Sequence, residues 1–185
     1  MLGTKLYKGK YTNKEYADLA VWCNANGCTI EEHEEYYECV AVPAPSLDEL
    51  KKAKLLEVDA WTANKITSGF VSTCYNDENI LYDTDEATQL TMTKARTNCK
   101  SEKFAINFPK GMPCRGYRKF SRDENGKFIF DKNDKLIFLF TPEQIIAWDE
   151  DFSLFLAKCK GEGWEKQAEV NACTTKEELE AIVFE

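Results

Sequence analysis

The stretch SGFVSTCYNDENILYDTDEATQLTM (residues 68–92) decides the organisation of this chain, because it lies between two segments with helical patterns. Its apolar runs FVSTCY and NILY flank the turn-forming residues NDEN, and this order predicts a short β-hairpin. The acids and threonine of YDTDE follow, and the pattern then becomes helical again. The question is whether YDTDE forms a catalytic or metal-binding loop, or the structural joint between a hairpin and a helix.

Asp83 and Asp85 are the carboxylates on which this choice depends. Asp83 precedes TDEATQLTM and Glu86 follows three residues later, which predicts that Asp83 is the N-cap of a helix with acids in its first turn. A functional interpretation would make Asp83 and Asp85 an acid–base pair or part of a calcium loop. Common calcium loops have more oxygen ligands and a glycine at a fixed position, and a hydrolytic pair needs a partner and a cleft. The structural interpretation is favoured.

A long helix is predicted before the hairpin, over residues 46–68. Ser46 and Glu49 have the spacing of a capping box, and Gly69 ends the helix. One face of this helix is predicted to point to the core and carries Leu55, Val58, Thr62 and Ile66, with Trp61 beside them.

Residues 1–45 predict a small separate unit of one helix and one hairpin. Thr12 and Glu15 have the spacing of a capping box at the start of a helix, and Asn26-Gly27 suits its end. CTIE and YYECVAV predict two strands around the acidic turn EEHEE. The prolines of AVPAP close the unit, since proline neither continues a helix nor donates to a ladder.

A cysteine–histidine cluster in this unit has the spacing C-x4-C-x4-H-x5-C and consists of Cys23, Cys28, His33 and Cys39. Its order resembles a zinc knuckle, and three thiolates with one imidazole suit tetrahedral zinc. The first gap, however, is four residues instead of two, and Cys23 lies on the apolar face of the predicted helix. His33 lies among glutamates at a predicted hairpin tip. We therefore expect no metal here, and a small metal-dependent module is the alternative.

The composition excludes several classes of protein. The 185 residues are 43% hydrophobic and 30% charged, which is ordinary for a folded domain. The longest apolar runs are too short to cross a membrane and MLGTKLYKGKYT lacks the apolar core of a signal peptide, so we expect a cytosolic chain with no membrane role. The eight cysteines are scattered and predicted to be reduced. A net charge of −8 disfavours nucleic acid and anionic membranes as partners.

Residues 46–185 predict a helical domain with an inserted β-meander at about residues 101–140. YRKFSR, KFIFDK and KLIFLF alternate or run apolar, and the turn-forming segments DENG and KND separate them. This order predicts three antiparallel strands that are neighbours in sequence. Asn125-Gly126 is the pattern of a tight hairpin turn, because glycine accepts a positive φ.

A basic stretch with aromatic residues, residues 110–122, overlaps the first of these strands. Its members are Lys110, Arg115, Arg118, Lys119 and Arg122, with Tyr117 and Phe120. Cations interleaved with aromatic rings bind single-stranded nucleic acid by charge and stacking. The same residues also describe a basic edge strand that deters pairing with other chains. In so acidic a protein the structural interpretation is favoured.

The carboxy-terminal part predicts two further helices. Thr141 is predicted to cap the first, with Pro142 at its first position and Gln144 completing a capping box. Thr174, with Glu177 three residues later, is predicted to cap the last one.

The first of these helices has an apolar stripe made of Ile145, Trp148, Phe152, Phe155, Leu156 and Cys159. Gly161 and Gly163 follow the stripe and are expected to kink or interrupt the helix. The long helix from Leu47 and this stripe together offer more apolar and aromatic surface than one short hairpin covers, so we expect part of it to pack between chains. The competing interpretation is that the meander covers the stripe within one chain.

The order of these elements resembles a phage tail-associated domain of unknown function, which occurs in tail-fibre and minor tail proteins of phages and prophages. The matching segments are KKAKLLEVDAWTANKITSGF, YDTDEATQLTM and KQAEVNACTTKEELEAI. EYADLAVWCNANGCTIEEHEEYYECV is similar to a segment that often precedes such domains. The resemblance implies other tail or tail-fibre proteins as partners, self-association as one form of contact, and a place in the host bacterial cytoplasm or the virion tail. It implies no catalytic residues.

The sequence therefore predicts an α+β fold of long helices packed with short hairpins and a three-stranded antiparallel meander. The expected function is a non-enzymatic structural or assembly component of a tail that acts through protein–protein contacts. The alternative is a small metal-dependent module or enzyme that uses the cysteine–histidine cluster or the loop with Asp83 and Asp85. No GxGxxG, GxxxxGK[ST], HExxH or GxSxG motif occurs, and no catalytic, cofactor-binding or metal residue is assigned.

Overall fold

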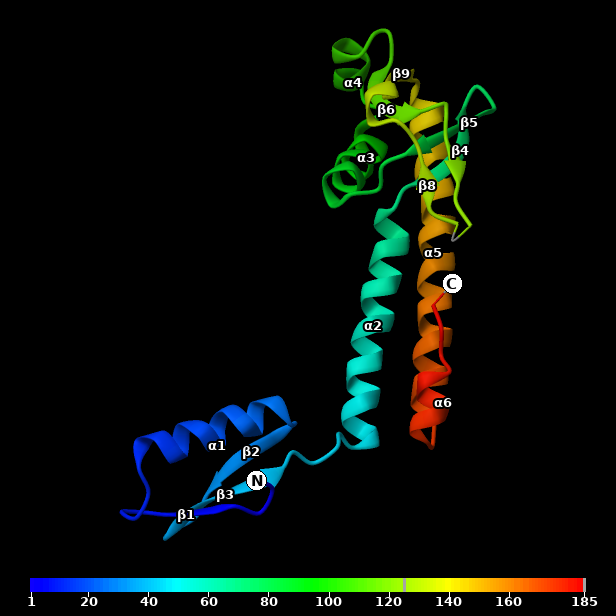
Figure 1. The fold of residues 1–185 in the computed structure, drawn as a ribbon. Helices are drawn as coiled ribbons and strands as arrows, with labels where there is room; N and C mark the ends of the chain where they lie inside the picture. Colours follow the sequence, from blue (N-terminus) through cyan, green and yellow to red (C-terminus); the bar gives the residue numbers. More distant parts are fainter. Residues whose placement is uncertain (125, 185) are drawn as a thin grey trace. The chain divides into compact units, whose positions relative to one another are not determined.

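The computed structural model describes residues 1–124 and 126–184 and has the predicted α+β fold. The chain forms two compact units, Met1–Ser46 and Leu47–Glu185 (Figure 1). No helix in the described part of the chain combines the length and the apolar character that a membrane crossing requires.

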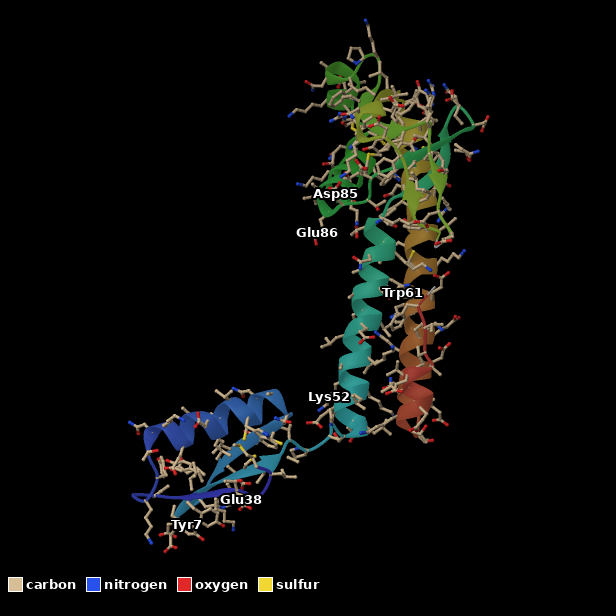
Figure 2. The ribbon with its side chains drawn as sticks, in the orientation of Figure 1. Tyr7, Glu38, Lys52, Trp61, Asp85 and Glu86 are labelled. Atoms are coloured by element: carbon tan, nitrogen blue, oxygen red, sulfur yellow. The ribbon has the colours of Figure 1, made fainter. Side chains whose placement is uncertain are left out.

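The first unit is a three-stranded antiparallel sheet with one helix on one face. Its elements are β1 (Lys5–Tyr7), α1 (Asn13–Ala25), β2 (Cys28–Glu32) and β3 (Tyr36–Ala41), and the strand order is β1-β3-β2. Thr12 and Glu15 form the predicted capping box at the start of α1. Leu19, Cys23 and Cys39 are buried between α1 and the sheet. Tyr7 and Glu38 lie on the face that α1 does not cover (Figure 2).

The second unit is built around two long helices that lie side by side, α2 (Leu47–Thr67) and α5 (Pro142–Ala172) (Figure 1). Val58 of α2 and Val170 of α5 are buried in a cluster with Leu179 of the short helix α6 (Lys176–Glu180). Polar contacts at the edge of this contact include the ion pair of Lys65 with Glu162, at 2.6 Å. The predicted bounds of α2 and the core position of Val58 are confirmed.

Helix α5 runs through both of its glycines without interruption, so the predicted break is wrong. Gly163 faces Thr62 of α2, and a Cβ on Gly163 would lie 2.4 Å from the Thr62 hydroxyl oxygen. Gly163 is therefore a close-approach residue that lets the two helix backbones come together, and it does not mark a kink.

The predicted caps of α5 and α6 have different outcomes. Thr141 and Gln144 form the capping box of α5 with Pro142 in its first turn, as predicted. The cap of α6 is Thr175, whose hydroxyl oxygen accepts from the Glu178 N–H, so the predicted cap at Thr174 is one residue too early. Both Thr174 with Glu177 and Thr175 with Glu178 have the three-residue spacing of a capping box. The sequence pattern therefore does not show which threonine is the cap.

A four-stranded antiparallel sheet packs against the amino-terminal half of α5. Its strands are β4 (Phe70–Tyr75), β5 (Glu78–Tyr82), β6 (Met112–Tyr117) and β9 (Leu136–Phe140), in the order β4-β5-β6-β9. The predicted hairpin of β4 and β5 is present, and its turn residues Asn76 and Asp77 have positive φ of 53° and 59°. Asparagine and aspartate tolerate this conformation, which a tight hairpin turn requires.

The three-stranded meander is formed by β4, β5 and β6, and the pairing within residues 101–140 differs from the prediction. YRKFSR contributes the end of β6 and then β7 (Ser121–Arg122), which pairs with β8 (Phe128–Ile129). KLIFLF forms β9, which pairs with β6 instead of β8. Of the predicted turn, Asn125 lies outside the described residues, and Gly126 has φ +76°. The segment also contains the helix α4 (Glu102–Asn107).

Burial explains why β9 joins the larger sheet. Phe138 and Phe140 are almost completely buried in the main core, which includes Ile145, Trp148 and Phe152 of α5. Pairing with the two-residue strand β8 would not bring these rings to α5. Four residues of the apolar stripe of α5, Ile145, Trp148, Phe152 and Cys159, are thus buried within the chain, and Phe155 and Leu156 are partly buried. Packing of the remaining apolar surface between chains stays a prediction.

We predict opposite effects for alanine at the two glycines of α5. Gly163→Ala should lower the free energy of unfolding by about 1–3 kcal/mol, because the added Cβ overlaps Thr62 and separates the helices. Gly161→Ala has no atom within 4 Å of its added Cβ, so it should raise stability by up to about 1 kcal/mol through helix propensity. Urea unfolding of both variants tests this prediction, and equal effects would show that the close contact with Thr62 does not matter.

Candidate functional site

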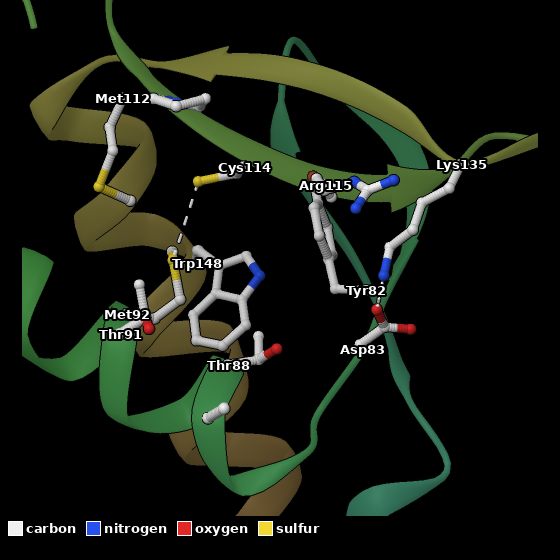
Figure 3. Close-up of a pocket in the computed structure, with 12 residues that line it drawn as sticks. Tyr82, Asp83, Thr88, Thr91, Met92, Met112, Cys114, Arg115, Lys135 and Trp148 are labelled. Atoms are coloured by element: carbon white, nitrogen blue, oxygen red, sulfur yellow. Dashed lines mark hydrogen bonds and ion pairs between the residues drawn. The ribbon is translucent and has the colours of Figure 1, made fainter.

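An apolar pocket of the second unit lies between α3 (Glu86–Asn98), strand β6 and helix α5 (Figure 3). Its volume is about 250 Å³. The floor is apolar and is formed by Trp148 of α5, Met92 of α3, and Met112 and Cys114 of β6. A concave apolar pocket with a few polar groups at its rim is the usual form of a small binding site.

The thiol of Cys114 is the nucleophilic atom closest to the pocket floor. Burial raises the pKa of Cys114 to about 12, so the thiol stays protonated near neutral pH. Its Sγ lies 3.8 Å from the sulfur of Met92. Burial also raises the pKa of Tyr82. Burial thus favours the neutral form of both side chains.

The rim of the pocket contains an ion pair between Asp83 and Lys135, drawn in Figure 3. Asp83 follows β5 and Lys135 precedes β9, so this pair joins two segments that are 52 positions apart in sequence. Asp83 is therefore not the N-cap of α3, and that prediction is wrong. The guanidinium of Arg115 lies at the same rim.

Asp85 is the N-cap of α3 and accepts hydrogen bonds at 2.9 Å from both the backbone N–H and the hydroxyl of Thr88. The Thr88 backbone N–H, followed by its hydroxyl, lowers the pKa of Asp85. Two aspartates two residues apart both precede the helical pattern. The sequence pattern does not show that Lys135 pairs with Asp83, or that Asp85 is therefore the residue that caps α3.

Thr84, between these two acids, is 1% exposed and completes the joint. Its hydroxyl accepts a hydrogen bond at 2.9 Å from the N–H of Gly69, two residues after the end of α2. Its carbonyl accepts a bond at 2.6 Å from the amide of Gln89 in α3. In the YDTD segment, Tyr82 packs in the core, and each of the next three residues has its own partner. Asp83 pairs with Lys135, Thr84 bonds to Gly69, and Asp85 bonds to Thr88.

The two carboxylates of this loop have different partners. Asp83 is neutralised by Lys135, and Asp85 is used by the first turn of α3. The residues that line the pocket include no histidine and no pair of nucleophile and base. The pocket thus has an apolar floor, with the ion pair of Lys135 with Asp83 and the Arg115 guanidinium at its rim.

The cysteine–histidine cluster is divided between the two faces of the sheet in the first unit. Cys23 and Cys39 face each other with a sulfur–sulfur distance of 3.0 Å, and Cys28 packs against the same cluster. His33 directly follows β2, and its Nε2 lies 3.8 Å from Glu38, which is on the other face of the sheet. There it stacks on Tyr36, with ring centroids 4.6 Å apart.

The three thiols are therefore together and the imidazole is not. Burial raises the pKa values of Cys28 and Cys39, and metal ligation requires thiolates. Within residues 1–124 and 126–184, no group of three or more histidine, cysteine or acidic side chains is arranged to hold a metal ion.

The side chains of the basic stretch, residues 110–122, differ in exposure and in their partners. Tyr117 is buried and Phe120 packs against the cluster of Leu81 and Phe128, so their faces are not open to bases. Arg118 pairs with Glu78 at 2.6 Å. Arg122 donates to a backbone carbonyl at 2.6 Å and lies over the ring of Phe128. The rings and two of the arginines are thus used within the chain.

Comparison with known proteins finds no matching family model, curated protein or solved structure for this chain.

The sequence did not identify the pocket, although it identified parts of its wall. Trp148 was predicted as a core residue, and YDTDE as a joint, but no pattern connects either to Lys135 or to Arg115. The pocket forms where β6 extends past the end of β5, since the pairing of these strands is confined to Leu81–Tyr117 and Tyr82–Gly116.

We predict that Asp85, and not Asp83, controls the start of α3. Asp85→Ala should lower the free energy of unfolding by about 1 kcal/mol, and Asp85→Asn by much less, since asparagine caps nearly as well. Because folding lowers the pKa of Asp85, its contribution is complete above the pKa of an unfolded aspartate, about 3.9, and is lost as the pH falls through the folded value. Faster exchange of the Thr88 amide proton in Asp85→Ala, but not in Asp83→Ala, would locate the effect. The reverse order would restore Asp83 as the cap.

We also predict that purified protein holds no stoichiometric zinc, because His33 lies on the opposite face from the three thiols. Elemental analysis after purification without chelators measures this directly. About one zinc per chain, together with unfolding when a chelator removes it, would contradict the prediction and favour the metal-dependent alternative.

Proposed function

We propose that the protein is a non-enzymatic structural or assembly component of a phage or prophage tail and acts through protein–protein contacts. The observation that carries the proposal concerns the segments that resemble the tail-associated domain. These segments are separate in sequence, yet in the structure they form one packed framework.

The first two segments are joined by the YDTD residues. The N–H of Gly69, at the end of KKAKLLEVDAWTANKITSGF, donates to Thr84 of YDTDEATQLTM. The third, KQAEVNACTTKEELEAI, packs on the first through the buried contact of Val170 and Leu179 with Val58. The residues that define the resemblance thus have structural partners, which supports a framework role over a catalytic one.

Exposed apolar and aromatic side chains support a role in protein contacts. Trp164 and Leu154 of α5 and Leu56 of α2 are exposed in the second unit. In the first unit, Tyr7 is exposed on the sheet face that α1 does not cover. Tryptophan and tyrosine are enriched in protein interfaces because they bury a large area with few rotatable bonds.

The chemistry of the pocket supports the same proposal over the enzymatic alternative. Its carboxylate is paired with Lys135, and its thiol is protonated near neutral pH because burial raises the pKa of Cys114 to about 12. The proposed partners are other tail or tail-fibre proteins. The proposed location is the host cytoplasm during assembly and, for a component that is retained, the virion tail.

An in-frame deletion in the encoding phage or prophage tests the proposal. We expect particles with filled capsids but incomplete or non-infectious tails, and restoration by the chain supplied from a plasmid. Immunogold labelling then separates a retained component, which labels tails, from an assembly factor, which does not. Normal tails and normal infectivity in the deletion strain would contradict the proposed function.

A further inference from the structure

The edge strand of a β-sheet has unpaired backbone N–H and C=O groups that can bind another chain. The two larger sheets have four edge strands, β1, β2, β4 and β9, and the first three are protected. Strand β1 has only three residues and carries Lys5. Strand β2 ends in Glu31 and Glu32. Strand β4 has a register shift between Ser72 and Tyr75, which is typical of a bulge that twists an edge out of line.

The fourth edge, β9, has none of these protections. Its sequence LIFLF contains no charge and no proline, and its register with β6 is continuous over all five residues. Among the described strands it has one neighbour, β6. Lys135, the nearest cation before the strand, is held by Asp83 and so does not guard the edge.

The outward face of β9 is apolar as well. Ile137 is 66% exposed and Leu139 is 43% exposed, whereas Phe138 between them is buried against α5. Alternation along the strand puts Ile137 and Leu139 on the same face. A solvated sheet face usually carries polar side chains, so this pair is an apolar patch at an unprotected edge.

The pairing of β9 with β6 also determines the direction of its free backbone groups. Pro113, opposite Leu139, has no N–H to donate, so the two residues suit a position at which the strands exchange no hydrogen bonds. Bonded and non-bonded positions alternate in an antiparallel ladder. The N–H and C=O groups of Ile137 and Leu139 then point away from β6, to the open edge.

We propose that β9 pairs antiparallel with β9 of a second copy of this chain, about a two-fold axis at Phe138. In this register, Ile137 of each copy lies opposite Leu139 of the other, and both residues supply the outward backbone groups. The two sheets become one continuous sheet, with the two apolar pairs next to each other on its face. The interface uses the same residues from both copies, as two-fold symmetry requires.

The occupant is a second copy because the edge is complementary to itself. Reversal of LIFLF about Phe138 keeps an apolar residue opposite every apolar residue and brings no like charges together. A strand from a different protein would need the same apolar pattern, and nothing in β9 selects for one. Five residues per copy make a small interface, so dissociation at roughly micromolar concentration is expected.

This pairing names a partner for the proposed assembly role, and in that respect it rests on the proposed function. Its evidence comes from different residues, however, and its test uses purified protein instead of virions. A failure of one is therefore distinguishable from a failure of the other.

Sedimentation and light scattering of the full chain over a range of concentrations test the proposal, with the variant Ile137→Lys. A lysine at this position places two ammonium groups in the shared patch, so we expect the wild type to dimerise and Ile137→Lys to remain monomeric. The matched control is Val21→Lys on α1, where the original side chain is 70% exposed and belongs to the first unit, not to the sheet that contains β9. It should dimerise like the wild type. Unchanged melting of both variants at low concentration verifies that they fold.

Hydrogen exchange of the peptide that contains residues 136–140 gives the second measurement. Its amides should exchange more slowly as the wild-type concentration rises, and at a constant fast rate in Ile137→Lys. A wild type that stays monomeric at all concentrations would overturn the proposal. So would a dimer that survives Ile137→Lys, or one that both lysine variants weaken equally.

Discussion

The packing of α5 is the constraint on which the second unit depends. Its amino-terminal half buries Ile145, Trp148 and Phe152 against the four-stranded sheet, and its carboxy-terminal half buries Val170 against α2 and α6. One helix of 31 residues thus belongs to both hydrophobic clusters. Because both clusters share this rigid element, the sheet and the helix pair are held in one body without a separate interface between them.

The joint at YDTD solves the local problem that this arrangement creates. Helix α2 ends where the sheet begins, and the sheet ends where α3 begins, so several backbone groups at the two ends need partners away from water. The Thr84 hydroxyl accepts a hydrogen bond from the N–H of Gly69, and the Thr84 carbonyl accepts one from the side-chain amide of Gln89. The Asp85 carboxylate accepts one from the backbone N–H of Thr88, in the first turn of α3. Acidic residues in such a loop resemble a catalytic or calcium-binding cluster in sequence. Their contacts show that they stabilise a junction.

The first unit shows that residues with the spacing of a metal-binding motif can lie on different faces of a sheet. Cys23 and Cys39 meet because a helix face packs on one sheet face, and they form part of a small apolar core. His33, just past the end of β2, contacts Glu38 and Tyr36 on the face opposite that core. The spacing of residues in a motif does not show on which face of a sheet each side chain lies. The spacing therefore includes His33 as a fourth ligand, although the fold places it on the opposite face from the thiols.

By itself, the sequence determined the elements whose signals are local. The capping boxes at Thr12 and Thr141, the turn at Asn76 and Asp77, and the apolar stripe of α5 each depend on residues within a few positions of one another. Only the tertiary structure decided the contacts between distant segments. Lys135 pairs with Asp83, so that Asp85 is the cap of α3, and β9 pairs with β6, which leaves the other edge of β9 open. The physical reason is that hydrogen bonds of a cap or turn close over three or four residues, whereas strand partners and ion pairs are selected by burial of rings such as Phe138 and Phe140. That burial depends on the whole chain, and no short window of sequence contains it.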